Sequence, residues 1–519
     1  MRRRDLLTSL AAAGLILPAR GRAAAAPVVR TRSGPIRGYL DDGISVFKGV
    51  PYGADTGPRR FQPPIPPAPW TEVRDTTAYG PASPQRGRET TAQSEDCLYL
   101  NVWTPALDRG HRPVMVYIHG GAYSTGSGSS PLYDGVRLCQ RGDVVVVTIN
   151  HRLGAFGYAY LARLVPDLPD SGNAGQLDLL LALQWVRDNI AAFGGDPGKV
   201  MVFGQSGGGA KIATMMAMPA AEGLFHRAAT MSGQQVTASG PGNATRRTQA
   251  WLNALKIKPG LAAELRTMPV ERLVKAMGVE DPVLGFGGLY FGPVLDERSL
   301  TRHPFYPDAP SQSANIPMMI GNTHDETRAF LGGDPTNFTV DWVGLPEKLS
   351  QANMRVDIDP ATVIAAYRRL YPAYSASDVL FAATTAARSW RAAIIEAEER
   401  AKAGTPAFVY QVDWVSPRES GKFGAPHMTD IPLAFDNVRA QGSNAIGPTA
   451  QPMADKVAEA FLAFARTGDP NCKALPRWEP YGLARRQTMV FDNTPRLDDD
   501  PRGAERRLFQ KVPFIQAGT

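Results

Sequence analysis

Residues 200–210 read VMVFGQSGGGA and place Ser206 between an apolar run and a stretch of small residues. The pattern Gly204-x-Ser206-x-Gly208 follows the apolar run directly and opens a helix-like stretch over residues 208–217. A serine on a sharp strand-to-helix turn is typical of a nucleophile elbow, where flanking glycines are needed because side chains have no room. The stretch therefore predicts an exposed, reactive Ser206 at the end of a sheet strand. A spectator serine in a glycine-rich turn is the alternative.

Apolar runs of strand length alternate with helix-length stretches on both sides of this motif. Unbroken apolar strands are buried on both faces, as in a sheet covered by helices. Residues 177–192 repeat apolar residues at helical spacing between two such runs, which predicts a parallel crossover. We expect an α/β fold with a central, mostly parallel sheet flanked by helices, and antiparallel strands over residues 28–50. The runs are Val114–Ile118, Val144–Ile149, Val200–Phe203, Ala228–Met231, Ile316–Ile320 and Ala407–Val412.

The N-terminus has the composition of an export signal. Arg3-Arg4-Asp5-Leu6-Leu7 precedes the apolar run Leu10–Leu17, and small residues follow as far as Ala26. Charged, apolar and small segments in this order are the parts of a signal peptide, and the paired arginines fit a twin-arginine signal. We expect an export signal over residues 1–26, a single domain over residues 27–519, and a periplasmic or secreted bacterial protein. An uncleaved membrane anchor is disfavoured because a span needs about 20 apolar residues.

Charge and cysteine content argue against several function classes. Residues 1–25 hold five arginines and one aspartate, so the net charge of +7 falls to about +3 in the rest of the chain. That charge, with no basic cluster between aromatics, does not predict a nucleic-acid partner. The three cysteines stand at no metal-ligand spacing, and no cofactor or metal is expected.

A second glycine-rich motif, His119-Gly120-Gly121-Ala122, directly follows the apolar run VMVYI. In the α/β-hydrolase fold, such a loop supplies backbone N–H groups to an oxyanion hole, and small residues let the backbone approach the substrate. We expect Gly121 and Ala122 to donate together with the N–H of Gly207. His119 is expected to be structural.

A serine hydroxyl needs a base beside it, and chain order sorts the seven histidines. This fold orders its residues as serine, acid, histidine. The acid is expected just past a strand, and IPMMIGN is followed by Asp325 and Glu326, either of which could orient an imidazole. After that segment the chain contains only His427, in the Gly/Pro-bounded loop GAPHMTDIP. The excluded histidines are His111, His119, His151, His226, His303 and His324.

The chain resembles the type B carboxylesterase family, which includes bacterial esterases, mammalian carboxylesterases and cholinesterases. Residues 94–102 (SEDCLYLNV) are similar to one family signature, and residues 193–209 (FGGDPGKVMVFGQSGGG) to the other. The resemblance implies the α/β-hydrolase fold, Glu326 as the triad acid in GNTHDET, and His427 as the base in HMTDIPLAF. Further similar segments are FKGVPYG (47–53), NHRLGAFGY (150–158), GNAGQLD (172–178) and ARTGDPN (465–471).

Three departures from the family pattern qualify the resemblance. Ser83 stands where the partner of Cys97 is often found, so Cys97 is expected to be unpaired. Gln205 replaces the more common glutamate beside the nucleophile. The loop between residues 83 and 97 lacks the tryptophan that binds choline in cholinesterases. In the segment that resembles the acyl pocket, Leu289 and Phe291 are the expected wall residues, among glycines that leave the pocket size open.

Together these features predict a serine hydrolase that cleaves carboxylic esters through Ser206, His427 and Glu326, by way of an acyl-enzyme. The expected partner is a small-molecule ester, with no stable membrane insertion. An amidase, carbamate or toxin-ester hydrolase with the same triad is an alternative, because the motif does not specify the bond. A non-catalytic adhesion-type binding module is another, although such proteins usually lack the nucleophile. Acyl length, alcohol size, charge preference and oligomeric state are left open.

Overall fold

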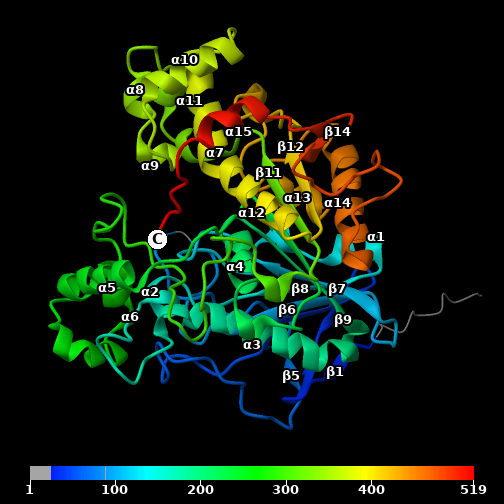
Figure 1. The fold of residues 1–519 in the computed structure, drawn as a ribbon. Helices are drawn as coiled ribbons and strands as arrows, with labels where there is room; N and C mark the ends of the chain where they lie inside the picture. Colours follow the sequence, from blue (N-terminus) through cyan, green and yellow to red (C-terminus); the bar gives the residue numbers. More distant parts are fainter. Residues whose placement is uncertain (1–24, 88, 519) are drawn as a thin grey trace, which may run out of the picture.

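The computed structural model describes residues 25–87 and 89–518, so the predicted export signal lies outside the described residues except for its last two positions. An 11-stranded sheet forms the centre of the molecule (Figure 1). Its strands from β7 to β13 run parallel, and antiparallel strands complete both edges. In spatial order they are β14 (Arg496–Asp499), β13 (Gln487–Phe491), β12 (Ala407–Val412), β11 (Met318–Thr323), β10 (Arg227–Met231), β9 (Gly195–Gln205), β7 (Arg112–Ile118), β8 (Val145–Ile149), β6 (Tyr99–Thr104), β4 (Ile44–Pro51) and β3 (Tyr39–Asp41).

The mostly parallel sheet predicted from the apolar runs is confirmed, and each of the six runs overlaps one of its strands. The antiparallel strands expected over residues 28–50 are also present. Some of them form a separate small sheet at the edge of the molecule, in which β1 pairs antiparallel with β2 and β5 pairs parallel with β2. Their bounds are β1 (Val28–Arg30), β2 (Pro35–Arg37) and β5 (Arg74–Asp75).

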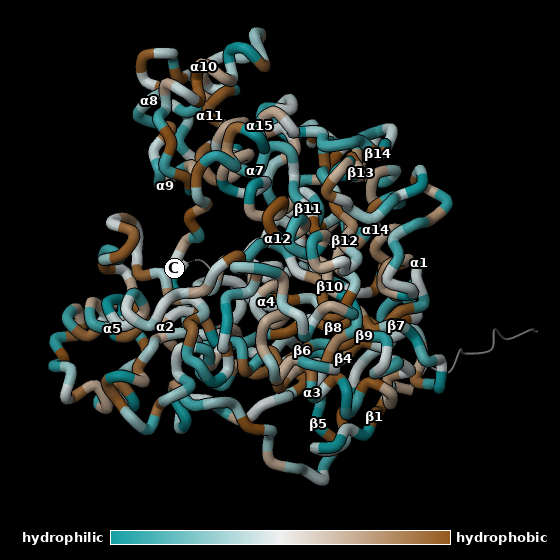
Figure 2. Tube along the Cα trace, in the orientation of Figure 1, coloured by the Kyte–Doolittle hydropathy of each residue, from teal (hydrophilic) through white to brown (hydrophobic). Residues whose placement is uncertain are grey.

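Side chains along each central strand point alternately into two hydrophobic cores. In β7, Val114, Val116 and Ile118 pack with one core, whereas Met115 and Tyr117 pack with the other. This alternation buries both faces of the sheet and explains why the strands read as continuous apolar runs. In Figure 2 the central strands are mainly brown, and teal residues are more frequent on the outer segments.

Helices cover both faces of the sheet. Residues of α3, α4 and α12 belong to the first core, and residues of α1, α13 and α14 to the second. The helices predicted over residues 177–192 and 208–217 correspond to α3 and α4. The bounds are α1 (Val136–Gly142), α3 (Ala174–Asn189), α4 (Gly207–Met215), α12 (Arg391–Lys402), α13 (Asp430–Ala434) and α14 (Ala450–Thr467).

Two further helical groups lie beside the sheet, with the C-terminal segment between them (Figure 1). One group has its own core around Trp251, and the other has a core that includes Val363, Leu380 and Phe509. No helix in the described part of the chain is long and apolar enough to cross a membrane. The bounds are α2 (Gly154–Tyr158), α5 (Pro241–Leu255), α6 (Val270–Ala276), α7 (Glu326–Leu331), α8 (Leu345–Lys348), α9 (Gln351–Met354), α10 (Pro360–Leu370), α11 (Ala376–Thr385), a π-helical turn (Ala386–Trp390) and α15 (Gly503–Phe509).

Candidate active site

Ser206 lies at a sharp turn between β9 and α4, as the glycine motif predicted. Its backbone has φ 56° and ψ −126°, a left-handed conformation that costs energy for a residue with a side chain. The neighbouring glycines are required by close packing: a Cβ atom on Gly208 would lie 1.9 Å from the carbonyl oxygen of Ile118. The turn therefore projects the side chain of Ser206 beyond the carboxyl end of β9, where open α/β sheets bind ligands.

Glu326 and His427 meet at the same end of the sheet. Glu326 follows β11 and His427 follows β12, the neighbouring strand. The Nδ1 atom of His427 forms a short hydrogen bond with Oε2 of Glu326, although the two residues are 101 positions apart. Glu326 is fully buried and His427 is 7% exposed. A carboxylate on Nδ1 fixes the ring orientation and leaves Nε2 as the atom able to take a proton.

Asp325, the alternative acid, has different partners. Its Oδ2 accepts a hydrogen bond of 3.0 Å from the backbone N–H of Ala425 and lies 3.2 Å from Nδ1 of His324. Its Oδ1 lies 3.3 Å from the guanidinium of Arg328. Glu326, not Asp325, is thus the carboxylate that contacts the imidazole of His427.

The surroundings of Glu326 favour its ionised form. Burial alone raises the pKa of this carboxyl group, but the positive charge and hydrogen bond of His427 lower it more, with help from Ser232 and the N–H of Thr323. That N–H donates to Oε1 at 2.8 Å. The net pKa lies below its ordinary value, so Glu326 is ionised at neutral pH and can stabilise an imidazolium on His427.

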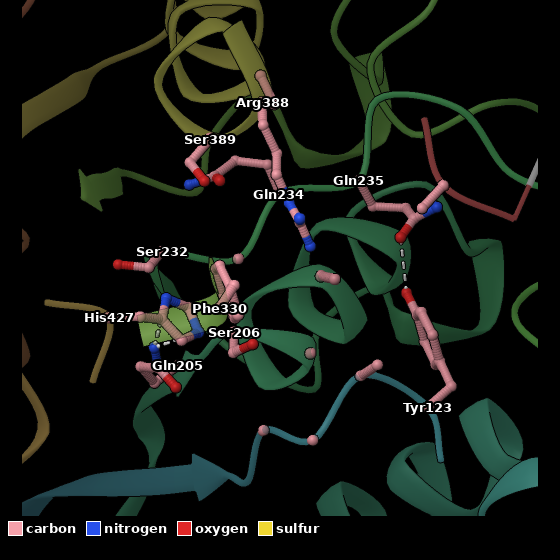
Figure 3. A pocket seen from close by; sticks show the side chains of 18 of the residues that line it. Tyr123, Gln205, Ser206, Ser232, Gln234, Gln235, Phe330, Arg388, Ser389 and His427 are labelled. Carbon is pink, nitrogen blue, oxygen red and sulfur yellow. Dashed lines mark hydrogen bonds between the residues drawn. The ribbon is translucent and has the colours of Figure 1, made fainter. Parts of the chain in front are cut away.

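Gln205 is a second polar side chain in contact with the His427 ring, after Glu326. Its Nε2 lies 3.0 Å from Nε2 of His427 and 3.3 Å from Nδ1 (Figure 3). Among the described residues, the hydroxyl of Ser206 forms no hydrogen bond with His427, but both side chains line the same cavity. The structure therefore brings the three predicted residues to one site. The amide of Gln205, and not the hydroxyl of Ser206, is the hydrogen-bonding neighbour of Nε2 of His427.

The predicted oxyanion loop lies against the elbow. Gly121 (φ 82°) and Ala122 (φ 53°) both have left-handed backbones, and both line the cavity together with Gly207. Within the described chain, the N–H groups of these three residues have no hydrogen-bond acceptor. Unpaired N–H groups facing a cavity are available to an anionic oxygen.

The remaining histidines do not reach Ser206 or its cavity. His119 and His151 are buried and stack at 4.8 Å, and burial together with the charge of Lys211 lowers the pKa of His119 to about 3. His226 and His303 each accept a hydrogen bond from a backbone N–H. These placements agree with the structural role expected for His119 and with the exclusion of the other three histidines as the base.

A cavity of about 450 Å³ opens over Ser206. Leu289 and Phe291, the expected wall residues, lie in the buried core beside Trp251, whereas Tyr290 between them lines the cavity. Arg355, Arg388 and the other distant wall residues could not be predicted from the sequence, because no local motif marks them. The lining also includes Tyr123, Tyr133, Ala210, Ser232, Gly233, Gln234, Gln235, Phe330, Ser389, Ala392, Met428, Phe514, Gln516 and Ala517.

The described residues contain no cluster of three His, Cys, Asp or Glu side chains suited to a metal ion. Cys97 is buried and unpaired, as predicted. In the position of the missing partner, Ser83 accepts a 3.0 Å hydrogen bond from the N–H of Leu153. The hydroxyl thus ties the same region together without a disulfide.

Comparison with known proteins relates this site to a family. A family model described as the carboxylesterase family matches residues 25–509. Para-nitrobenzyl esterase of Bacillus subtilis (strain 168) is 35% identical over 499 residues, which cover 92% of this chain and 98% of that protein. Phenmedipham hydrolase of Pseudarthrobacter oxydans is 36% identical over 488 residues, covering 88% and 93%. A crystal structure of a Geobacillus stearothermophilus carboxylesterase superposes with a TM-score of 0.84 at 38% identity, covering 93% of this chain and 100% of that one.

Proposed function

The chain belongs to the carboxylesterase family and is a carboxylic ester hydrolase, and on that premise we propose that Ser206, His427 and Glu326 form its catalytic triad. The contact between the buried Glu326 and His427, in a cavity shared with the strained Ser206, carries this proposal. A carboxylate, an imidazole and a serine that meet in this way are recognised by geometry, whatever their order along the chain.

In the first half-reaction, His427 takes the proton of the Ser206 hydroxyl through Nε2 while the oxygen attacks the ester carbonyl. This step requires the hydroxyl to replace the Gln205 amide as the partner of Nε2 in the substrate complex. Glu326 remains ionised and stabilises the imidazolium. The alcohol then leaves with the proton from His427, and the acyl group stays on Ser206.

The N–H groups of Gly121, Ala122 and Gly207 stabilise the negative charge that develops on the carbonyl oxygen. Removing one such donor typically costs about 10²–10³-fold in rate. In the second half-reaction, water attacks the acyl-enzyme with His427 again as the base. The products are a carboxylic acid and free Ser206.

The Ser206→Ala variant tests this proposal with a short-chain aryl ester as substrate. We expect kcat to fall by about 10⁴-fold or more. The thermal midpoint should not change, because the Ser206 side chain forms no hydrogen bond with any of the described residues. Ser129→Ala is a matched control, since Ser129 does not line the cavity. Full turnover by Ser206→Ala would disprove the role of Ser206.

We also propose that the enzyme is exported to the bacterial periplasm or medium, because its N-terminal sequence has the parts of a twin-arginine signal. Replacing Arg3 and Arg4 by lysine should keep the enzyme in the cytoplasmic fraction of a bacterial host. Export of this variant at the normal level would contradict the assignment.

A further inference from the structure

Two arginines line the cavity over Ser206. Arg355 follows α9, and Arg388 belongs to the π-helical turn between α11 and α12. The lining contains no aspartate or glutamate. Across the described residues, neither guanidinium has a salt bridge or a side-chain hydrogen bond, and that of Arg388 lies over the ring of Phe330. Both guanidinium groups thus line the cavity without a paired carboxylate.

Fully buried arginines elsewhere in the molecule have hydrogen-bond partners, unlike the two cavity arginines. Arg152 pairs with Asp178 and Arg247 pairs with Asp281, each at 2.6 Å. Arg400 has no carboxylate partner but donates to the backbone carbonyl oxygens of Ser313 and Ile316. Placing a guanidinium out of water is costly unless a carboxylate compensates it. In the cavity no carboxylate pairs with either guanidinium, and only the charge of the more distant Glu326 acts on Arg388. A ligand could therefore supply a direct anionic partner.

The positive charges of the two cavity arginines also repel each other. Burial and the nearby charge of Arg355 lower the pKa of Arg388 to about 10, and burial lowers the pKa of Arg355. Both groups nevertheless carry a full charge at neutral pH. An anion between them would relieve both the desolvation and the repulsion.

Arg388 stands close to the reacting groups. Its guanidinium lies 4.6 Å from the centre of the Phe330 ring, and that ring lies 4.6 Å from the ring of His427. Figure 3 shows the side chain of Arg388 extending from its helix toward the space beside Ser206. A π-helical turn is common at functional sites, where it re-aims a side chain. A group held by Arg388 would thus belong to the same molecule as the ester.

We propose that Arg355 and Arg388 bind a carboxylate carried by the ester substrate, so that the enzyme prefers half-esters and other anionic esters to neutral ones. This inference rests on the proposed function, because it places the anion in the cavity of Ser206. Guanidinium groups match the geometry of a carboxylate and form charge-assisted hydrogen bonds with it.

Pairs of substrates that differ only in charge test the proposal. For the acyl half, monoethyl glutarate is compared with its uncharged analogue ethyl 4-carbamoylbutanoate. For the alcohol half, (4-acetoxyphenyl)acetate is compared with (4-acetoxyphenyl)acetamide. We expect the charged member of at least one pair to have a kcat/KM at least tenfold higher, and that pair identifies the half that carries the anion.

Variants of the two arginines then link the preference to the cavity. Arg388→Gln and Arg355→Gln should each lower the ratio of kcat/KM for charged over neutral substrate by about tenfold, mainly through KM. Arg388→Lys should retain part of the ratio, because it keeps the charge and loses the planar fork. Arg369→Gln, on the exposed surface of α10, removes the same charge outside the cavity and should leave the ratio unchanged.

Failure of this inference and failure of the proposed function give different results. If neutral esters are hydrolysed through Ser206 but neither pair shows a preference for charge, the anionic-substrate inference is wrong. If Ser206→Ala retains turnover, the proposed function is wrong, and binding of glutarate to this variant still tests the arginines. Calorimetry should then detect binding of glutarate to Ser206→Ala, and the added substitution Arg388→Gln should weaken this binding at least tenfold. An equal affinity with and without Arg388→Gln would overturn the inference.

Discussion

The ammonium group of Lys211 donates a 2.7 Å hydrogen bond to the carbonyl oxygen of Ala122, 89 residues earlier in the chain. A second hydrogen bond, of 3.2 Å, reaches the carbonyl oxygen of His119. Lys211 is fully buried in α4, the helix that begins directly after Ser206. One helix thus positions the nucleophile and also holds the loop whose N–H groups face the cavity.

Loss of this contact should reduce catalysis more than binding. In Lys211→Met, the carbonyls of His119 and Ala122 lose their donor. These carbonyls belong to the peptide units on either side of the two that carry the N–H groups of Gly121 and Ala122, so the oxyanion loop loses an anchor at both ends. We expect kcat to fall by at least tenfold, which is a fraction of the loss caused by removing an oxyanion donor outright. Lys199→Met, a lysine on β9 that is 45% exposed, is the control. Equal kcat values for the two variants would contradict the role of Lys211.

The residue beside the nucleophile should set the acidic limit of activity. In Gln205→Glu, a carboxylate replaces the amide next to the His427 ring and stabilises the protonated imidazole. Because the base must be neutral, the acidic limb of the kcat/KM profile should move up by about one pH unit. Gln205→Leu removes the contact without adding charge and should not move the limb upward. An unmoved limb in Gln205→Glu would mean that the two side chains do not interact during catalysis.

The two adjacent carboxylates should differ sharply in their effect on rate. Glu326→Gln removes the charge that opposes an imidazolium on His427 and should lower kcat by about 10³–10⁴-fold. Asp325→Asn alters contacts with His324, Arg328 and the N–H of Ala425, and should lower kcat less than tenfold. Steady-state kinetics on one ester distinguishes them, and the opposite ranking would assign the acid to Asp325.

Glu396 should make the stability of the enzyme depend on pH. Its carboxylate is buried in α12, one oxygen accepts a 2.8 Å hydrogen bond from the N–H of Gln235, and burial raises its pKa to about 8. The unfolded chain loses this proton near its ordinary pKa, so the folded state is penalised increasingly from about pH 4.5 to 8 and constantly above.

Glu396→Gln removes that ionisation while keeping an oxygen acceptor. The free energy of unfolding of the variant, relative to wild type, should therefore rise between pH 5.5 and 8.5, by an amount on the order of a few kcal/mol. Urea denaturation at the two pH values measures this difference. Glu399→Gln, on the same helix, should show no such rise, and a flat difference for Glu396→Gln would contradict the burial argument.

The sequence was sufficient for those features that local pattern determines. Close backbone packing requires glycines around Ser206, and burial of both sheet faces requires apolar runs such as Val114–Ile118. Both requirements are therefore visible in the local sequence. His427 was found by chain order, because it is the only histidine after the segment that holds the acid. In the structure the strands that precede the two residues, β11 and β12, are neighbours in the sheet.

Features formed by distant segments left no such trace. Arg388 lines the cavity from a π-helical turn. This turn belongs to a helical group that no pattern in the sequence predicted. The glycine-rich segment around Tyr290 predicted wall residues, but the residue that lines the cavity depends on a register that packing against Trp251 determines. The contact of Gln205 with His427 likewise depends on a rotamer, which composition does not specify.

Covalent trapping of the nucleophile tests the central claim most directly. The enzyme is incubated with an organophosphate ester that phosphorylates activated serines, and the peptides are mapped by mass spectrometry. We predict one stoichiometric adduct on Ser206, loss of activity in proportion to labelling, and strongly slowed labelling in His427→Ala. An inactivated enzyme with its adduct on another residue, or labelling of Ser206 at an unchanged rate without His427, would contradict the account.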